Sequence, residues 1–195
     1  MTDSVNLVLA SSSAYRRELL ARLGIRFEVA APQLVEQREP REPPASMAMR
    51  LAESKALAVA ANRPGALIIA ADQVAHLDGE ILEKPKGAAA AIRQLTRVAG
   101  RRVEFLTAVC VRDGRDGRLH RHLDTTQASF RQLSAQEVIR YVEREPAFDC
   151  AGGFRAEALG IALFEKLESE DPTGVIGLPL IATARLLREC GLEIP

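Results

Sequence analysis

Hydroxyl and guanidinium side chains gather in one short stretch of the sequence, LVLASSSAYRRELLARLGI, at residues 7–25. Three serines, from Ser11 to Ser13, follow a short apolar run, and Arg16 and Arg17 come shortly after them. Backbone N–H groups at a helix start, serine hydroxyls and paired arginines are the donors that hold a chain of phosphates. A simpler alternative is a serine that caps a helix, followed by two arginines in solvent. Both interpretations predict a turn from strand to helix at this point.

Acids and lysines farther along the chain could complete a site for a phosphate chain. Asp72 follows the apolar run ALIIAA, where a strand end can point a carboxylate into a cleft. Lys55 lies in a helix-like segment, Lys84 lies in LEKPK, and Glu36 lies in a polar loop. Taken singly, each is most simply an ordinary turn or surface residue. With the two arginines, they supply the groups needed to bind a metal-bound triphosphate and to activate water.

The sequence lacks the short signatures of the commonest enzyme classes, namely GxxxxGK[ST], GxGxxG, GxSxG and HExxH. Its three histidines lie on strand-like segments, and we assign them no role. The three cysteines, Cys110, Cys150 and Cys190, are far apart and form no CxxC pair. This spacing argues against a disulfide framework and against a zinc cluster.

The elements that must position these residues alternate between strand and helix. Strands are predicted at 5–10, 26–32 and 66–82, the last with a hairpin at Asp78-Gly79, and two long antiparallel strands within 101–133 join at 114–117. Helices are predicted at 15–23, 45–62, 88–98, 134–145 and 179–190. The segment 33–44 is too polar and proline-rich for a regular element, and loops of that length are often functional. This order predicts an α/β protein with a mixed, largely antiparallel sheet flanked by helices.

Composition limits the classes of partner. The chain has 195 residues, of which 47% are hydrophobic, a length that suits one domain or two small lobes. Lys and Arg number 26 and Asp and Glu number 26, so no net charge attracts nucleic acid or an anionic membrane, and phosphate binding must be local. No apolar run reaches 18 residues, and no basic region followed by a long apolar stretch opens the chain. We expect a cytoplasmic protein with neither a membrane partner nor stably bound nucleic acid.

Six separated motifs resemble, in order and over nearly the whole length, the Maf family of nucleoside triphosphate pyrophosphatases. They are LASSSAYRRELLARLGI, LAESKA, AADQV, GEILEKP, CAGGFRAEALG and VIGLPL. The resemblance implies a Maf-like (ITPase-like) α/β fold, with one domain over residues 1–195 and two lobes around a central cleft. It also implies a requirement for Mg²⁺ or Mn²⁺, release of pyrophosphate to leave the monophosphate, and often a homodimer.

The resemblance gives each candidate residue a role in that reaction. Residues that would hold the triphosphate are Ser11, Ser13, Arg16 and Arg17. Glu36 and Asp72 would hold the metal ion through oxygen, and Asp72 would also accept a proton from the attacking water. Lys55 and Lys84 would neutralise the charge that builds on the leaving pyrophosphate.

Three further residues fall at the positions that set base preference within the family. Tyr15, Gln73 and Glu157 make the chain most similar to the branch that hydrolyses 7-methyl-GTP. The expected substrate is therefore a small nucleotide, 7-methyl-GTP, and its hydrolysis would remove this modified nucleotide from the pool. Tyr15 would face the base while the serines and arginines hold the phosphates.

Two alternatives remain open from the sequence. In the first, the chain is a pyrophosphatase for dTTP, UTP or a modified pyrimidine nucleotide, and Tyr15 and Glu157 are packing and surface residues. In the second, it is a non-catalytic protein that binds nucleic acid or the division machinery. The basic residues behind that second alternative are Arg112, Arg115, Arg118 and Arg121. They more simply form the solvated face of a hairpin.

Overall fold

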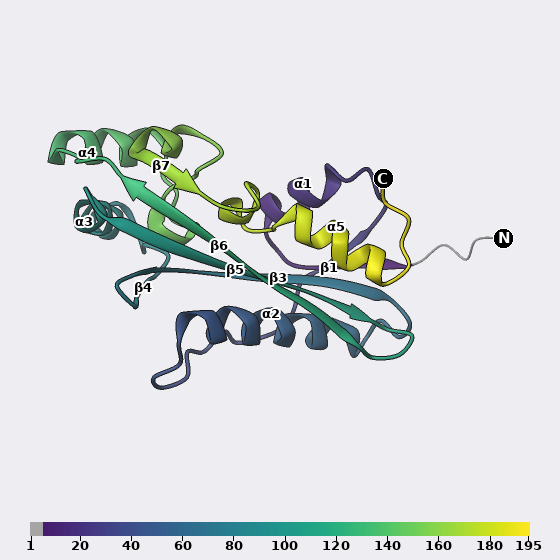
Figure 1. The fold of residues 1–195 in the computed structure, drawn as a ribbon. Helices are drawn as coiled ribbons and strands as arrows, with labels where there is room; N and C mark the ends of the chain where they lie inside the picture. The colour runs from purple at the N-terminus through teal and green to yellow at the C-terminus, as the bar shows by residue number, and fades with distance from the viewer. Residues whose placement is uncertain (1–5) are drawn as a thin grey trace.

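A mixed β-sheet forms the centre of the molecule (Figure 1), which a computed structural model describes over residues 6–195. Within the described residues its seven strands are β1 (Leu7–Ala10), β2 (Glu28–Ala30), β3 (Leu67–Leu77), β4 (Glu80–Leu82), β5 (Arg102–Asp113), β6 (Leu119–Phe130) and β7 (Phe164–Glu168). They lie in the order β2-β1-β3-β5-β6-β7, and β4 pairs with β3. Strand β1 is parallel to β2 and β3, whereas the other pairs among these strands are antiparallel. The predicted α/β fold with a mixed, largely antiparallel sheet is confirmed.

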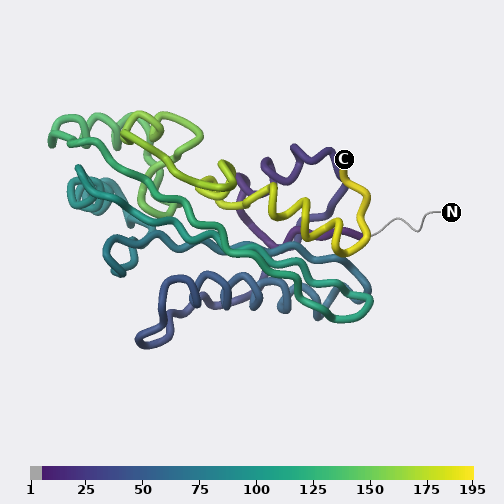
Figure 2. The backbone as a smooth tube through the Cα atoms, viewed as in Figure 1, coloured from purple at the N-terminus to yellow at the C-terminus, as the bar shows by residue number. Residues whose placement is uncertain are grey.

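Helices cover both faces of the sheet. The α-helices are α1 (Ala14–Ala21), α2 (Pro44–Ala60), α3 (Ala88–Val98), α4 (Ala135–Arg144) and α5 (Leu180–Glu189), and the short 3₁₀-helices are η1 (Ala151–Gly153), η2 (Leu159–Leu163) and η3 (Gly174–Ile176). Helix α2 lies along one face, while α1 and α5 lie on the other face (Figures 1 and 2). Helices α3 and α4 pack together at the far end of the long strands.

The two covered faces explain why the short first strand is apolar throughout. Leu7 and Leu9 pack into the core beneath α1 and α5, and Val8 and Ala10 pack into the core beneath α2. Successive side chains of a strand point to opposite faces, so a strand buried on both faces reads as a continuous apolar run. The same alternation along β3 sends Ile69 toward α5 and Ile68 toward α2.

Two turn signals read from the sequence have the expected local geometry. Asp78 and Gly79 have φ values of 51° and 82°, and this pair of positive angles suits a two-residue hairpin between β3 and β4. The Ser134 side chain accepts a hydrogen bond from the backbone N–H of Glu137 at 3.3 Å, and the Glu137 carboxylate accepts one from the backbone N–H of Ser134 at 2.8 Å. This capping box begins α4 where it was predicted.

Other features were not predicted. The sequence pattern predicted neither strand β7 nor the three 3₁₀-helices found within residues 6–195. The β7 sequence FEKLE is short and mostly charged, so it carries no clear strand pattern of its own. It forms a strand by pairing with β6, and a local sequence pattern does not show that pairing. The first strand was predicted to begin at Val5, which lies outside the described residues; in the structure Asn6 precedes the strand, which begins at Leu7.

A gap along one edge of β3 determines where a site can form. Strand β1 pairs with β3 only as far as Leu9 opposite Ile69, and β4 pairs with it only from Leu82 opposite Ala75. Between those pairings, residues 70–74 of β3 have β5 as their one strand partner among residues 6–195. The edge left open in the middle of the sheet carries the AADQV motif.

Candidate active site

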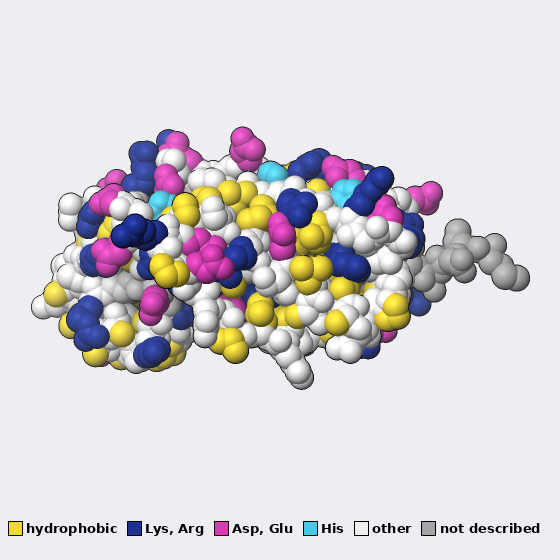
Figure 3. Space-filling view, turned by 90° about the horizontal axis from the view of Figure 1, so that it is seen from below, with side chains coloured by type: hydrophobic (Ala, Val, Ile, Leu, Met, Phe, Trp, Pro, Cys, Tyr) yellow, Lys and Arg dark blue, Asp and Glu magenta, His cyan; other side chains and the backbone are white. Residues whose placement is uncertain are grey.

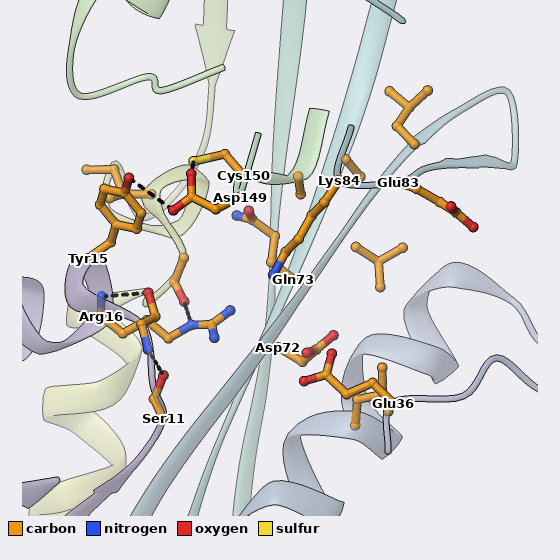
Figure 4. Close-up of a pocket in the computed structure, with 18 of the residues that line it drawn as sticks. Ser11, Tyr15, Arg16, Glu36, Asp72, Gln73, Glu83, Lys84, Asp149 and Cys150 are labelled. Carbon is orange, nitrogen blue, oxygen red and sulfur yellow. Dashed lines mark hydrogen bonds between the residues drawn. The ribbon is translucent and has the colours of Figure 1, made fainter. Parts of the chain in front are cut away.

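A cavity of about 880 Å³ lies at the open edge of β3 (Figure 4). Its wall combines the turn after β1, the loop before α2, α2 itself, the β3–β4 hairpin and two later segments, 149–157 and 175–177. The predicted site residues that line it are Ser11, Ser13, Tyr15, Arg16, Glu36, Lys55, Asp72, Gln73, Lys84 and Glu157. The fold thus brings together groups that lie far apart along the chain.

Arg17 is the predicted site residue that the structure does not bring into the cavity. Its side chain is exposed, and it is not among the residues of the described chain that line the wall. Successive residues of an α-helix point about 100° apart, and on α1 Tyr15 and Arg16 face the cavity whereas Arg17 points away from it. For Arg17, the interpretation as an arginine in solvent fits the structure.

The serine turn both caps α1 and lines the cavity. Ser11 is buried, and its Oγ accepts a hydrogen bond from the backbone N–H of Ser13 at 3.1 Å. Ser13 is the N-cap of α1, and its Oγ accepts from the backbone N–H of Arg16 at 3.4 Å. Because each hydroxyl is used here as an acceptor, its own proton remains available to donate to a phosphate oxygen. The two interpretations of the serines are therefore compatible.

The Arg16 guanidinium is fixed by the loop at η3. Its Nε donates to the carbonyl oxygen of Gly177 at 2.8 Å, and the guanidinium points from α1 toward the middle of the cavity (Figure 4). Gly177 has a φ of 125°, which favours glycine over residues with a side chain. Burial lowers the pKa of Arg16, and the charges of Asp72 and Glu36 oppose that effect.

The two predicted metal ligands share one lysine. Asp72 and Lys55 are each only 5% exposed, and the Lys55 Nζ lies 2.5 Å from Asp72 Oδ1 and 2.8 Å from Glu36 Oε1. Burial raises the pKa of Asp72, although Lys55 and Arg16 act in the opposite direction. Partial burial would also raise the pKa of Glu36, but the hydrogen bond from Lys55 and the charges of Lys84 and Arg16 lower it overall. Pairs of carboxylates whose surroundings move their pKa values apart are suited to different chemical roles.

These carboxylates fit a hard divalent cation that is shared with a substrate. Within residues 6–195 no group of three or more His, Cys, Asp or Glu side chains could hold a metal ion. Mg²⁺ is commonly bound by one or two carboxylates together with substrate phosphates and water, rather than by a cage of protein groups. Glu36 and Asp72 match the smaller protein contribution that this mode needs.

Gln73 holds the η3 loop in place. Its Nε2 lies 3.0 Å from each of three oxygens, namely Thr107 Oγ1 and the carbonyls of Gly174 and Val175. The orientation of the amide is fixed because the two carbonyls can only accept hydrogen bonds. The Thr107 hydroxyl in turn donates to the Gly174 carbonyl at 2.9 Å. The amide nitrogen of Gln73 is therefore engaged by the protein, and only its oxygen is left for a substrate.

A second group of polar residues surrounds Tyr15. Its hydroxyl donates to Asp149 Oδ2 at 3.4 Å, and the Arg155 guanidinium carbon lies 5.4 Å from the centre of its ring. Burial and the neighbouring Cys150 and Asp149 raise the pKa of Tyr15 to about 12. Glu157 lines the same cavity, and partial burial raises the pKa of its carboxyl group.

Several charged residues of the wall have no role predicted from the sequence. They are Arg38, Glu83, Lys86 and Asp149. Each lies beside an assigned segment, in the polar loop, in LEKPK or before CAGG, so position next to a motif was the available signal. Two glycines of the CAGGFRAEALG motif, Gly152 and Gly153, follow the wall residues Asp149, Cys150 and Ala151, and their φ values of 81° and 79° favour glycine.

The chain is similar to known proteins over nearly its whole length. The family described as Maf-like protein matches residues 6–190. The chain is 51% identical over 189 residues to the 7-methyl-GTP pyrophosphatase of Xanthomonas oryzae pv. oryzae (strain MAFF 311018), covering 97% of this chain and 98% of that protein. It is also 51% identical to the protein of that name from Aromatoleum aromaticum (strain DSM 19018 / LMG 30748 / EbN1), covering 97% of both chains.

A solved structure is similar in fold alone. The Staphylococcus aureus Ham1 protein matches with a TM-score of 0.50 and 15% identity, and the match covers 95% of this chain and 97% of that chain. The likeness agrees with the mixed sheet and its flanking helices. From the match over residues 6–190 and the two relatives, the chain belongs to the Maf family.

Proposed function

We propose that the protein hydrolyses 7-methyl-GTP to 7-methyl-GMP and pyrophosphate and so removes a modified nucleotide from the pool. One observation carries the proposal: a single cavity joins the buried group of Asp72, Lys55 and Glu36 to the aromatic and acidic group of Tyr15 and Glu157. The name of the relatives that are 51% identical over nearly the whole chain supports the same substrate.

The triphosphate is bound between these two groups. In Figure 4 the side chains of Arg16 and Lys84 reach toward the middle of the cavity, between Tyr15 and Asp72 in that view. Arg16 offers its remaining N–H donors in a planar array that suits phosphate oxygens, while Lys84 offers a point charge. The hydroxyl protons of Ser11 and Ser13 add donors at the start of α1.

Asp72 orients the attacking water and accepts its proton on a carboxylate oxygen. Its raised pKa makes it a stronger base than an ordinary carboxylate, and its buried position limits the ways in which the water can be held. The bond that breaks joins the α-phosphoryl group to the bridging oxygen, which leaves with pyrophosphate. Lys55 and Lys84 stabilise the negative charge that grows on that leaving group.

A divalent metal ion, Mg²⁺ or Mn²⁺, would be held by Glu36 and Asp72. When bound, such an ion neutralises phosphate charge and lowers the pKa of a coordinated water. Glu36 suits the holding role because its lowered pKa keeps it ionised, and Lys55 keeps both carboxylates close together.

The base is recognised at the other end of the cavity. Methylation at N7 places a positive charge on the guanine ring, and a cation over an aromatic face is stabilised by about 0.5–2 kcal/mol. Tyr15 provides that face, and the Glu157 carboxylate can accept hydrogen bonds from the N1–H and the 2-amino group. Gln73 contributes its free amide oxygen and the position of the η3 loop.

The alternative of nucleic-acid binding has little support on the surface. Three of the four arginines of the β5–β6 hairpin are paired with acids: Arg115 with Asp113, Arg118 with Asp116, and Arg121 with Glu53. Figure 3, which views the molecule from the α2 side, shows acidic and basic side chains interspersed. Among residues 6–195 no helix is long and apolar enough to cross a membrane.

Pyrophosphate release from a panel of nucleotides tests the proposal. We expect 7-methyl-GTP to exceed GTP, dTTP and UTP in kcat/KM, with activity in Mg²⁺ or Mn²⁺ and none in EDTA. The triple change Tyr15→Arg, Gln73→Thr, Glu157→Gln should move the preference toward dTTP and UTP. A wild type that prefers dTTP or UTP would support the pyrimidine alternative, and salt-dependent binding to DNA or RNA without turnover would support the non-catalytic one.

The homodimer implied by the family resemblance stays a prediction. Light scattering of the purified chain over a range of concentrations would test it, since a mass that stays at 21.2 kDa contradicts it.

A further inference from the structure

The carboxylate of Asp149 faces the cavity beside the base-binding ring. Its side chain is 63% exposed and lines the wall, so it is open to a ligand. It accepts a hydrogen bond from the Tyr15 hydroxyl at 3.4 Å, and its Oδ1 lies 3.6 Å from an Arg155 nitrogen. Arg155 lies over the Tyr15 ring but is not among the described residues that line the cavity. Asp149, Tyr15 and Arg155 therefore form one connected group at the rim.

We propose that Asp149 is a specificity-determining residue that favours a purine base carrying a positive charge. The inference rests on the proposed function and adds a residue to its base selection. None of the motifs that identify the family contains Asp149, and Glu157 was the single acid expected at the base.

Three physical effects act in the same direction. The carboxylate attracts a cationic base directly across the cavity. Its hydrogen bond with the Tyr15 hydroxyl increases the electron density of the ring, and a more electron-rich face binds a cation better. It also balances the charge of Arg155, which would otherwise repel a second cation at the same ring. A neutral guanine base feels little of any of these effects.

The exposed position of Asp149 limits the size of the effect. Solvent screens charges at the rim, and exposed charge pairs contribute about 0.2–1 kcal/mol. We therefore expect Asp149→Asn to lower the ratio of kcat/KM for 7-methyl-GTP to that for GTP by about two- to fivefold. The rate with GTP itself should change little, because the phosphate-binding and proton-accepting groups remain in place.

Arg155 supplies a test of opposite sign. Arg155→Gln removes the cation that the ring already faces, so it should raise the same ratio. In the double variant Asp149→Asn, Arg155→Gln, the ratio should return toward the wild-type value. Asp116→Asn, an exposed turn residue of the β5–β6 hairpin, is the matched control and should leave the ratio unchanged.

Binding of the monophosphates separates this inference from the proposed function. Calorimetric dissociation constants for 7-methyl-GMP and GMP measure base preference without any hydrolysis. If the wild type releases no pyrophosphate from either triphosphate, the proposed function fails, and the ratio of these constants still tests Asp149. Asp149→Asn should lower that preference; an unchanged ratio, an equal loss for both bases, or a shift of the same sign in Arg155→Gln would overturn the inference.

Discussion

At the scale of single residues, the buried pair of Asp72 and Lys55 links stability to catalysis. We expect Asp72→Asn to lower pyrophosphate release by about 10²–10⁴-fold, because a positioned base is lost while the shape of the side chain is kept. The variant should still fold. Loss of one partner of a buried ion pair costs about 3–5 kcal/mol, and Glu36, 2.8 Å from the same nitrogen, offsets part of that cost.

Urea unfolding of the single and double variants separates the two effects. Asp72→Asn with Lys55→Met leaves no unpaired buried charge at this pair, so the free energy of unfolding should recover while turnover does not. A near-normal rate in Asp72→Asn would rule out Asp72 as the proton acceptor.

The adjacent arginines of α1 form a natural matched pair. Arg16→Ala removes a half-buried guanidinium that faces the cavity, whereas Arg17→Ala removes one that is exposed outside it. A charged hydrogen bond contributes about 1.5–3 kcal/mol, so we expect Arg16→Ala to lower kcat/KM about 10- to 150-fold. The loss should be similar for all nucleoside triphosphates, since phosphates carry no base identity.

Steady-state kinetics on 7-methyl-GTP, GTP and UTP check this prediction. Arg17→Ala should remain close to the wild type with all three. A large loss in Arg17→Ala would show that the exposed arginine moves to the substrate on binding. A change in base preference in Arg16→Ala would contradict its assignment to the phosphates.

At the scale of elements, the short η3 turn connects the sheet to Arg16, the proposed phosphate ligand. Thr107 on β5 and Gln73 on β3 hold the carbonyl of Gly174, and the carbonyl of Gly177, three residues later, holds Arg16. Gly174 packs so closely that a Cβ there would collide with the buried carboxylate of Asp124. The position of Arg16 therefore depends on β3 and β5, which reach it through the η3 turn.

Thr107→Val should weaken this connection. The change leaves a buried carbonyl and amide with one partner fewer, a cost of about 1–3 kcal/mol in the free energy of unfolding. It should also lower kcat/KM by a similar factor for every base, because Arg16 loses its fixed support. Thr107→Ser keeps the hydroxyl and should restore activity even if the lost methyl group leaves some instability. Equal activity in both variants would contradict the inference that the Thr107 hydroxyl supports Arg16 through the η3 turn.

Local patterns predicted the elements better than they predicted the site. The helix at 88–98 and the turn at Asp78-Gly79 depend on nearby residues, so sequence was sufficient for them. The convergence of Glu36, Lys55 and Asp72 instead depends on where β1 stops and β4 begins along β3. Arg17 shows the same limit for a single residue. Arg16 and Arg17 look alike in the sequence, and the direction in which each points from α1 decides which of them faces the cavity.

At the scale of the whole molecule, acidic and basic residues are equal in number over the full sequence, and they are also equal in number in the wall of the cavity. The lining cations are Arg16, Arg38, Lys55, Lys84 and Lys86, and the lining acids are Glu36, Glu83, Asp72, Asp149 and Glu157. With five residues of each sign, the wall alone offers no net positive charge to a triphosphate. Under the proposed function, Asp149 and Glu157 would favour a cationic base, and Glu36 and Asp72, which already pair with Lys55, would hold a metal ion between themselves and the phosphates.

This balance leads to a prediction about how metal and nucleotide bind. Because Glu36 and Asp72 are the two protein carboxylates at the proposed ion, Mg²⁺ alone should bind weakly and a nucleotide analogue with a non-hydrolysable α–β bridge should strengthen its binding. Linkage requires Mg²⁺ to strengthen binding of the analogue by the same factor, which we expect to be about 5- to 150-fold. Calorimetric titrations in both orders measure the two factors.

Glu36→Gln should reduce the coupling, whereas Glu39→Gln, in the same loop but outside the cavity wall, should not. Equal binding of the analogue in Mg²⁺ and in EDTA would contradict a metal ion at the proposed site. Loss of coupling in Glu39→Gln would contradict a specific role for Glu36 as its ligand.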